Sequence, residues 1–157
     1  MLTFNNRGLL IPENIIPSTL EEFEIEFAIN EDKRSQLFEQ YKLYCHSLKA
    51  VCDNKPITQW IDGSYVTKSK NPSDIDLVFF LDHETVKTKE KELKQFIYPQ
   101  SMALYGIDAY IIVIYPHNNK YAYHTDADKA YWIDHFGNTK PNRSRKKIPK
   151  GFLEIII

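Results

Sequence analysis

Cysteines and long apolar runs are scarce in this chain of 157 residues, and each scarcity excludes a class of protein. The two cysteines, Cys45 and Cys52, lie in a segment that we predict to be helical. Seven residues of helix span roughly 10 Å at a rise of ~1.5 Å per residue, which is too far for a disulfide. Without a Cys-x-x-Cys motif, they are interpreted as reduced core thiols of a cytoplasmic protein. No apolar run approaches the ~18 residues of a membrane span.

Signal-peptide features and strong net charge are also lacking. The first residues, "MLTFNNRGLLIPENIIP", have neither a basic start nor a long apolar stretch, so we expect a cytoplasmic protein without membrane contact. A net charge of −1 argues against a polybasic binder of nucleic acid or membrane surfaces. The composition, 43% hydrophobic and 13% aromatic, excludes disorder. We expect one domain over 1–157, with 1–17 as an extended N-terminal arm.

Apolar periodicity predicts alternating helices and strands. The spacing of Leu37, Tyr41, Tyr44, Leu48 and Val51 indicates an amphipathic helix. The predicted helices are one capped by Ser18 or Thr19, then 31–53, 83–97 and 126–136; the predicted strands are 57–62, 74–82, 106–116 and 152–157. The 64–73 link is too short for a helical crossover, so the sheet must be mixed. The fold class is therefore α/β (α+β), with a mixed central sheet flanked by helices.

Two aspartates open the most apolar of these strands, "DIDLVFFLD" (74–82). Side chains at positions i and i+2 of a strand share a face, so Asp74 and Asp76 project together while Ile75 and Leu77 point into the core. Adjacent carboxylates repel each other, and one tends to stay protonated. A divalent cation removes that cost, and oxygen-only ligands suit Mg²⁺ or Mn²⁺.

Other polar residues are expected beside this pair. Asp108 lies at the start of the next predicted strand and would supply a third carboxylate if the two strands are neighbours, and the three together would make a two-metal arrangement. Gly63 and Ser64 end the strand before, where glycine permits close approach of the backbone to a ligand and the hydroxyl can hold phosphate oxygens. Lys68 and Lys70 add positive charge. The Gly-Ser pair could equally be a plain turn.

The order Gly-Ser, short loop, Asp-x-Asp and a later Asp on the next strand resembles the DNA polymerase β-type nucleotidyltransferase superfamily. The phrase "SDIDLVFF" is similar to its minimal bacterial members, and the core motifs cover 57–116. The segments "FNNRGLLIP" and "PKGFLEIII" look like those of a family of short bacterial proteins that carry this core. Many minimal members have an Arg-Gly pair after Gly-Ser, where this chain has "YVTK" (65–68).

The resemblance implies a nucleotidyltransferase fold and transfer of a nucleoside monophosphate from an NTP with two Mg²⁺ or Mn²⁺ ions. It marks Asp74, Asp76 and Asp108 as catalytic metal ligands, and Gly63, Ser64 and Lys68 as nucleotide-binding residues. The acceptor would be a protein or an RNA, with a partner protein involved, as in toxin–antitoxin or phage-defence modules. The alternative is a non-catalytic NTP sensor or regulatory partner with the same fold.

Three further features each have two interpretations. The basic loop, residues 138–150, could contact phosphate through Arg143 and Arg145 or could be simply solvated. His124, Asp126 and Asp128 could bind a metal, or could mark a helix start capped by Thr125 or Asp126. The aromatic residues could stack a base, or could belong to the core; they are Tyr121, Tyr123, Tyr131 and Trp132.

Overall fold

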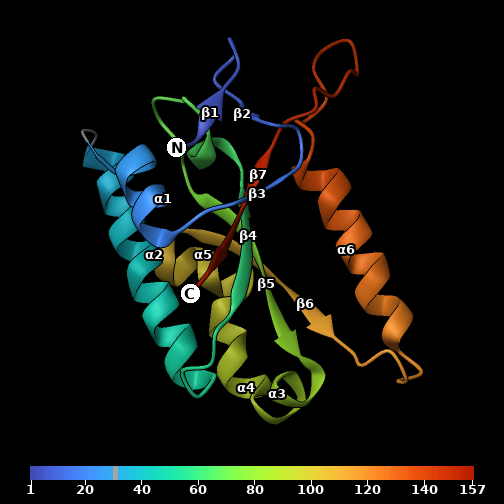
Figure 1. The fold of residues 1–157 in the computed structure, drawn as a ribbon. Coiled ribbons are helices and arrows are strands. Elements are labelled where there is room, and N and C mark those ends of the chain that lie inside the picture. Colours follow the sequence, from blue (N-terminus) through green and yellow to red (C-terminus); the bar gives the residue numbers. More distant parts are fainter. Residues whose placement is uncertain (30–31) are drawn as a thin grey trace.

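A five-stranded mixed β-sheet forms the centre of the protein, with helices on both faces (Figure 1). The structure is a computed structural model, and it describes residues 1–29 and 32–157. The strands are β1 (Thr3–Phe4), β2 (Leu10–Ile11), β3 (Ile15–Pro17), β4 (Thr58–Asp62), β5 (Ile75–Asp82), β6 (Ile107–Ile114) and β7 (Phe152–Ile156). The helices are α1 (Leu20–Phe27), α2 (Asp32–Val51), η1 (Ser64–Val66), α3 (His83–Thr88), α4 (Glu90–Leu93), η2 (Lys94–Phe96), α5 (Gln100–Tyr105) and α6 (Ala122–Phe136).

The strand order in the sheet is β3-β7-β4-β5-β6. The β4–β5 and β4–β7 pairs are antiparallel, whereas β5–β6 and β3–β7 are parallel. The prediction of a mixed sheet flanked by helices is therefore confirmed. The short link between β4 and β5 makes them an antiparallel pair, and the longer segment of helices between β5 and β6 allows the parallel crossover.

The two faces of the sheet have different partners. In β5, Ile75, Leu77 and Phe79 are fully buried in the larger core cluster, which α1 and α2 complete on one side of the sheet. Val78 points to the opposite face and packs with Phe136 of α6 in a smaller cluster. Because strand side chains alternate, residues at even positions of β5 lie on the face that α6 covers.

Most sequence-predicted elements are present, with small changes at their ends. Helix α1 has Thr19 as its N-cap, whose side chain accepts a hydrogen bond from the Glu22 amide at 3.1 Å. The predicted helix 31–53 is observed as α2, and position 31 lies outside the described residues. Cys45 and Cys52 are buried and form no disulfide, as expected. Within the described ranges, no helix combines the length and apolar character that a membrane span requires.

The predicted single helix over 83–97 is wrong. The chain forms α3, α4 and η2 instead, with a break at Lys89, whose ψ of 19° is not helical. Helix α3 has no buried residue, whereas Leu93 and Phe96 beyond the break are buried in the larger cluster. The break turns the chain so that these side chains reach the core, where the Tyr44 hydroxyl donates to the Phe96 carbonyl at 2.9 Å.

Three other segments also differ from the prediction. Helix α5 is absent from the predicted elements, and it ends at Gly106, which has φ +68° and lies before β6 rather than within the predicted strand. Helix α6 starts at Ala122, and Thr125 lies inside it rather than capping it. The Thr125 hydroxyl donates to the Val113 carbonyl and so fastens α6 to β6. The N-terminal arm is extended as expected, but it also holds the β1–β2 pair and β3, which adds an edge strand to the sheet.

Candidate functional site

Three aspartates form a row across neighbouring strands at one level of the sheet. Asp76 of β5 is the register partner of Asp62 on β4 and of Asp108 on β6. Register partners project from the same face, and adjacent strands are only about 4.8 Å apart. This is the face that α6 covers. Asp74, two positions before Asp76, adds a fourth carboxylate on the same side. The predicted proximity of Asp74, Asp76 and Asp108 is confirmed.

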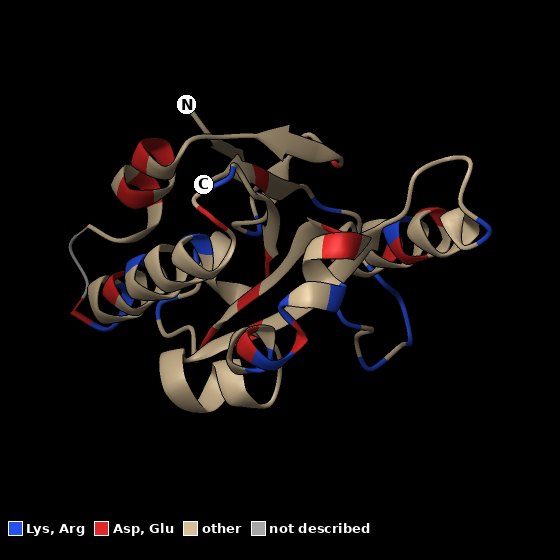
Figure 2. Ribbon diagram, turned by 90° about the horizontal axis from the view of Figure 1, so that it is seen from below, with Lys and Arg blue, Asp and Glu red and all other residues tan. Residues whose placement is uncertain are grey.

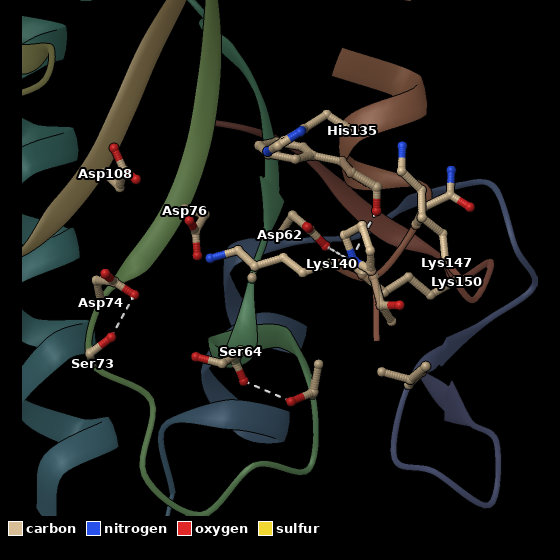
Figure 3. Close-up of a pocket in the computed structure, with 17 residues that line it drawn as sticks. Asp62, Ser64, Ser73, Asp74, Asp76, Asp108, His135, Lys140, Lys147 and Lys150 are labelled. Carbon is tan, nitrogen blue, oxygen red and sulfur yellow. Dashed lines mark hydrogen bonds and ion pairs between the residues drawn. The ribbon is translucent and has the colours of Figure 1, made fainter. Parts of the chain in front are cut away.

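The Gly-Ser turn lies directly against this row. Gly63 follows β4 with φ +81°, a backbone conformation that residues other than glycine rarely adopt. A Cβ built on Gly63 would lie 1.7 Å from Oδ2 of Asp76, so the glycine is required by close approach as well as by backbone conformation. The turn continues into η1, and the Ser64 carbonyl accepts from the Thr67 hydroxyl at 2.8 Å (Figure 3). Ser64 itself is exposed toward the site.

Asp62 is neutralised by a buried lysine. The Lys150 ammonium forms an ion pair with the Asp62 carboxylate and donates to the Phe136 carbonyl at 2.9 Å. The two side chains are only 7% and 9% exposed. Burial raises the pKa of Asp62, and the ammonium of Lys150 opposes that shift. Lys150 therefore anchors the end of the basic loop to the row of aspartates.

The carboxylates face a pocket of about 470 Å³, which we call the lysine pocket. Its wall opposite the sheet comes from the end of α6 and from the basic loop, a segment without acidic residues (Figure 2). Lys140 extends across the pocket toward Asp76, and Lys147 lies further out (Figure 3). The lining residues are Leu9, Asp62, Gly63, Ser64, Thr67, Ser73, Asp74, Asp76, Asp108, His135, Phe136, Asn138, Thr139, Lys140, Pro141, Lys147 and Lys150.

The crowding of carboxylates changes their proton affinity. Burial, together with the nearby charges of Asp74, Asp62 and Asp108, raises the pKa of Asp76 to about 6. Burial also raises the pKa of Asp108, with the Tyr110 hydroxyl acting against the shift. Oδ1 of Asp108 is buried and, among the described residues, has no hydrogen-bond partner. The row therefore holds more negative charge than its protein surroundings balance.

A buried arginine supports the turn from behind. The guanidinium of Arg34 donates to the carbonyls of Tyr65 at 2.8 Å and Thr67 at 2.9 Å, and also to that of Ser69. It lies over the Tyr65 ring at 5.1 Å, and the Tyr65 hydroxyl donates back to the Arg34 carbonyl. The loop that follows Ser64 is thus held by one side chain on α2, which keeps the turn in position against the row.

Some sequence-predicted residues lie elsewhere. Lys68 is not part of the pocket lining; its ammonium pairs with Glu26 and lies 4.1 Å from the Phe4 ring centroid. Arg143 and Arg145 are exposed and do not line the lysine pocket either. The basic loop does line the pocket, but with Lys140, Lys147 and Lys150 rather than with the two arginines.

The pocket-lining residues that sequence reasoning missed include Asp62, His135, Lys140 and Lys150. The sequence contains only a weak indication that Asp62 lies at the site: it directly precedes the Gly-Ser turn and shares a strand face with Trp60. For Lys150 it contains none, since its partner Asp62 lies 88 positions away. His135 lies at the end of α6, one turn of helix before the basic loop, and nothing in its local sequence distinguishes it.

The predicted metal cluster and the predicted aromatic core residues in and next to α6 both differ from their predictions. His124, Asp126 and Asp128 form no metal-binding group, and in the described parts of the chain no three or more His, Cys, Asp or Glu side chains, the row of aspartates included, form a ready-made one. The interpretation of Tyr121, Tyr123 and Tyr131 as core residues is wrong, because their exposed fractions are 42%, 63% and 60%. Tyr131 and Trp132 line a second pocket that borders Asp76 and Asp108.

Comparisons with known proteins place the chain in a family without assigning an activity. Among the curated proteins and the solved structures, none matches it. A family model with the description "Family of unknown function (DUF6932)" matches residues 2–156. That match covers nearly the whole sequence, including the row of aspartates, the Gly-Ser turn and the basic loop. The chain therefore belongs to the DUF6932 family, a family of unknown function.

Proposed function

We propose that the protein is a metal-dependent nucleotidyltransferase that transfers a nucleoside monophosphate from an NTP to a hydroxyl of a protein or RNA acceptor. The observation that carries this proposal is the register pairing of Asp76 with Asp108 on adjacent parallel strands, with Asp74 on the same face. These carboxylates face the Gly63–Ser64 turn and a wall of lysines. The resemblance of these motifs to the DNA polymerase β-type superfamily supports the same interpretation.

The donor chemistry of the three aspartates, and not a ready-made geometry, is what suits Mg²⁺ or Mn²⁺ here. Asp74, Asp76 and Asp108 offer only oxygen ligands, which these ions prefer. Two features favour a cation at this place: the unpartnered buried oxygen of Asp108, and the raised pKa of Asp76 among like charges. When bound, two such ions would neutralise the carboxylates and the triphosphate and polarise the reacting phosphoryl group. Asp74, Asp76 and Asp108 would hold these ions.

The chain's own residues would position the NTP. The Ser64 hydroxyl and the open backbone of the turn would bind phosphate oxygens, since the glycine leaves no side chain in the way. Lys140 and Lys147 would supply positive charge from the opposite wall. Arg34 would keep the turn rigid, so that the α-phosphorus lies in line with the attacking hydroxyl.

The chemical step is an in-line displacement. The acceptor hydroxyl oxygen forms a bond to the α-phosphorus as the bond from that phosphorus to the bridging oxygen breaks, and pyrophosphate leaves with the electron pair. Asp108 helps to activate the acceptor hydroxyl, whose proton passes to solvent. Lys140 stands where it can balance charge on the departing pyrophosphate.

The test is a transfer assay with each α-³²P-labelled NTP and Mg²⁺ or Mn²⁺, with and without cell extract. We expect label in a protein or RNA band with the wild type and none with Asp76→Asn or Asp108→Asn. Lys68→Met is the matched control, because Lys68 lies outside the pocket, and it should keep the activity. Equal labelling by Asp76→Asn would refute the mechanism. Metal-dependent NTP binding without transfer under any condition would instead identify a nucleotide sensor.

A further inference from the structure

A second pocket, of about 270 Å³, lies on the other side of the aspartate row. We call it the aromatic pocket, because Tyr110, Tyr131 and Trp132 line it together with His135. It shares Asp76, Asp108, His135 and Phe136 with the lysine pocket. The two pockets therefore meet at the carboxylates, and one binding event could occupy both.

The rings of this pocket form an open surface. Tyr131 is 60% exposed, and its ring stacks on the His135 ring, with centroids 5.7 Å apart and an angle of 10° between the planes. Trp132 meets Tyr131 edge to face at 5.2 Å and lies 5.2 Å from Tyr110, which is itself exposed. These aromatic faces gain little from folding while they remain in water, because burial is what stabilises apolar surface.

The two pockets differ in the positive charge that lines them. The lysine pocket contains Lys140, Lys147 and Lys150, whereas no Lys or Arg is among the described residues that line the aromatic pocket. A phosphate is therefore favoured on the first side of the row, and a neutral flat group on the second. A volume of about 270 Å³ is just below the range of roughly 300 Å³ upward that drug-sized ligands need, so the pocket suits one ring system.

We propose that the aromatic pocket is a nucleobase site, in which a base stacks on the Tyr131 ring and contacts Trp132, whose ring is nearly perpendicular to it, while the attached sugar lies beside Asp108. The inference rests on the proposed function, because it assigns this pocket to the same reaction. Aromatic side chains bind all bases, since every base has a π-face. The base has two sources: the NTP itself, or the terminal nucleotide of an RNA acceptor.

The decisive variant is Tyr131→Ala, with Tyr123→Ala as its matched control. Both are tyrosines of α6, with exposed fractions of 60% and 63%, but Tyr123 does not line the aromatic pocket. Trp132 provides a signal, because the only other tryptophan, Trp60, is buried at 4% exposure. Adenosine, which has a base but no phosphate, should quench the fluorescence of Trp132, and Trp132→Phe should abolish that quenching.

We expect adenosine to bind Tyr131→Ala at least about fivefold more weakly than it binds the wild type or Tyr123→Ala, as the loss of one stacking contact predicts. If Tyr131→Ala and Tyr123→Ala bind adenosine equally, or if adenosine does not quench at all, the pocket is not a nucleobase site. Neither result depends on phosphate or metal.

Titrations with Mg²⁺ present separate the two sources and test the proposed function independently. If the base belongs to the NTP, Tyr131→Ala weakens ATP binding but leaves inorganic tripolyphosphate binding unchanged. If it belongs to the acceptor, Tyr131→Ala leaves ATP binding unchanged and weakens binding of a short single-stranded oligoadenylate. Tripolyphosphate that binds Asp76→Asn as tightly as the wild type would refute the proposed function, whatever adenosine does.

Discussion

A side chain at Gly63 would collide with the carboxylate of Asp76. A Cβ at this position would lie 1.7 Å from Oδ2, 2.6 Å from Cγ and 3.1 Å from Cβ of Asp76, so rotation of the carboxylate alone does not relieve the contact. The turn after β4 and the start of β5 are therefore built as one unit, with the phosphate-binding candidate and the metal-ligand candidate in direct contact.

Gly63→Ala should both destabilise the protein and move Asp76. The residue would have to hold φ +81° and also push the facing strand away, so we expect the free energy of unfolding to fall by about 2–4 kcal/mol. The measurement is urea unfolding. Gly106→Ala is the control, because Gly106 has φ +68° but its Cβ would lie 3.5 Å from Leu37. It should cost about 1–2 kcal/mol, from backbone strain alone. Equal losses in the two variants would show that the collision does not matter.

Lys150→Met should be strongly destabilising. The substitution leaves the Asp62 carboxylate buried without its ion-pair partner, and breaking a buried pair in this way costs about 3–5 kcal/mol. Lys147→Met is the control, since Lys147 pairs with Asp134 on the surface, with side chains 46% and 69% exposed. We expect that control to cost about 0–1 kcal/mol in urea unfolding.

The double variant Asp62→Asn/Lys150→Met tests the reason for this effect. Removing the charge of Asp62 as well should recover part of the stability that Lys150→Met loses. A double variant as unstable as the sum of the two single variants would mean that the ion pair is not the source of the effect.

Asp76 should make the metal-free protein less stable as the pH rises. Its pKa is about 6 in the folded state, above the value of about 3.9 for an unfolded chain. The folded state therefore binds the proton more tightly, and the resulting stabilisation is complete below about pH 4 and is lost as the pH rises through 6. Burial of Asp76 raises this pKa most strongly, the carboxylates of Asp74, Asp62 and Asp108 raise it further, and Lys140 opposes the shift.

Asp76→Asn removes this dependence. In EDTA at pH 8, we expect the variant to be more stable than the wild type by about 1–3 kcal/mol, and we expect this difference to vanish near pH 4. Urea unfolding across that range measures it. A variant that is less stable than the wild type at pH 8 would contradict the charge-crowding argument.

Mg²⁺ should make the wild type more stable than Asp76→Asn, the reverse of their order in EDTA. An ion that binds only the folded state stabilises it by about 2.7 kcal/mol at one hundred times its dissociation constant. We therefore expect Mg²⁺ or Mn²⁺ to raise the melting temperature of the wild type and EDTA to cancel the rise. Asp76→Asn should show a much smaller rise, and NaCl at matched ionic strength should have little effect on either protein. A rise of equal size in the Asp76→Asn variant would show that the ion binds elsewhere.

The local features of the fold follow from local sequence. The apolar stripe of Leu37, Tyr41, Tyr44 and Leu48 is buried as its spacing predicted. Because side chains alternate along β5, Asp76 and Leu77 lie on opposite faces of the sheet. The short link after β4 makes β4 and β5 an antiparallel pair. Helix ends were less predictable. The break at Lys89 has no Gly or Pro to mark it, because it serves contacts of Phe96 with distant residues.

The candidate site also combines features that follow from local sequence with features that depend on contacts between distant residues. The sequence alone determined that Asp74 and Asp76 share a face, that Ser64 follows a glycine at a strand end, and that a basic segment lies near the end of the chain. Those properties depend on residues a few positions apart, whose relative directions are set by strand and turn geometry. Only the tertiary structure decided that Asp62 joins the row, that Lys150 rather than Arg143 or Arg145 reaches it, and that the tyrosines of α6 stay exposed beside it. These contacts bring together segments that are far apart in the chain, and sheet register and helix packing select them through burial and charge pairing that no local pattern encodes.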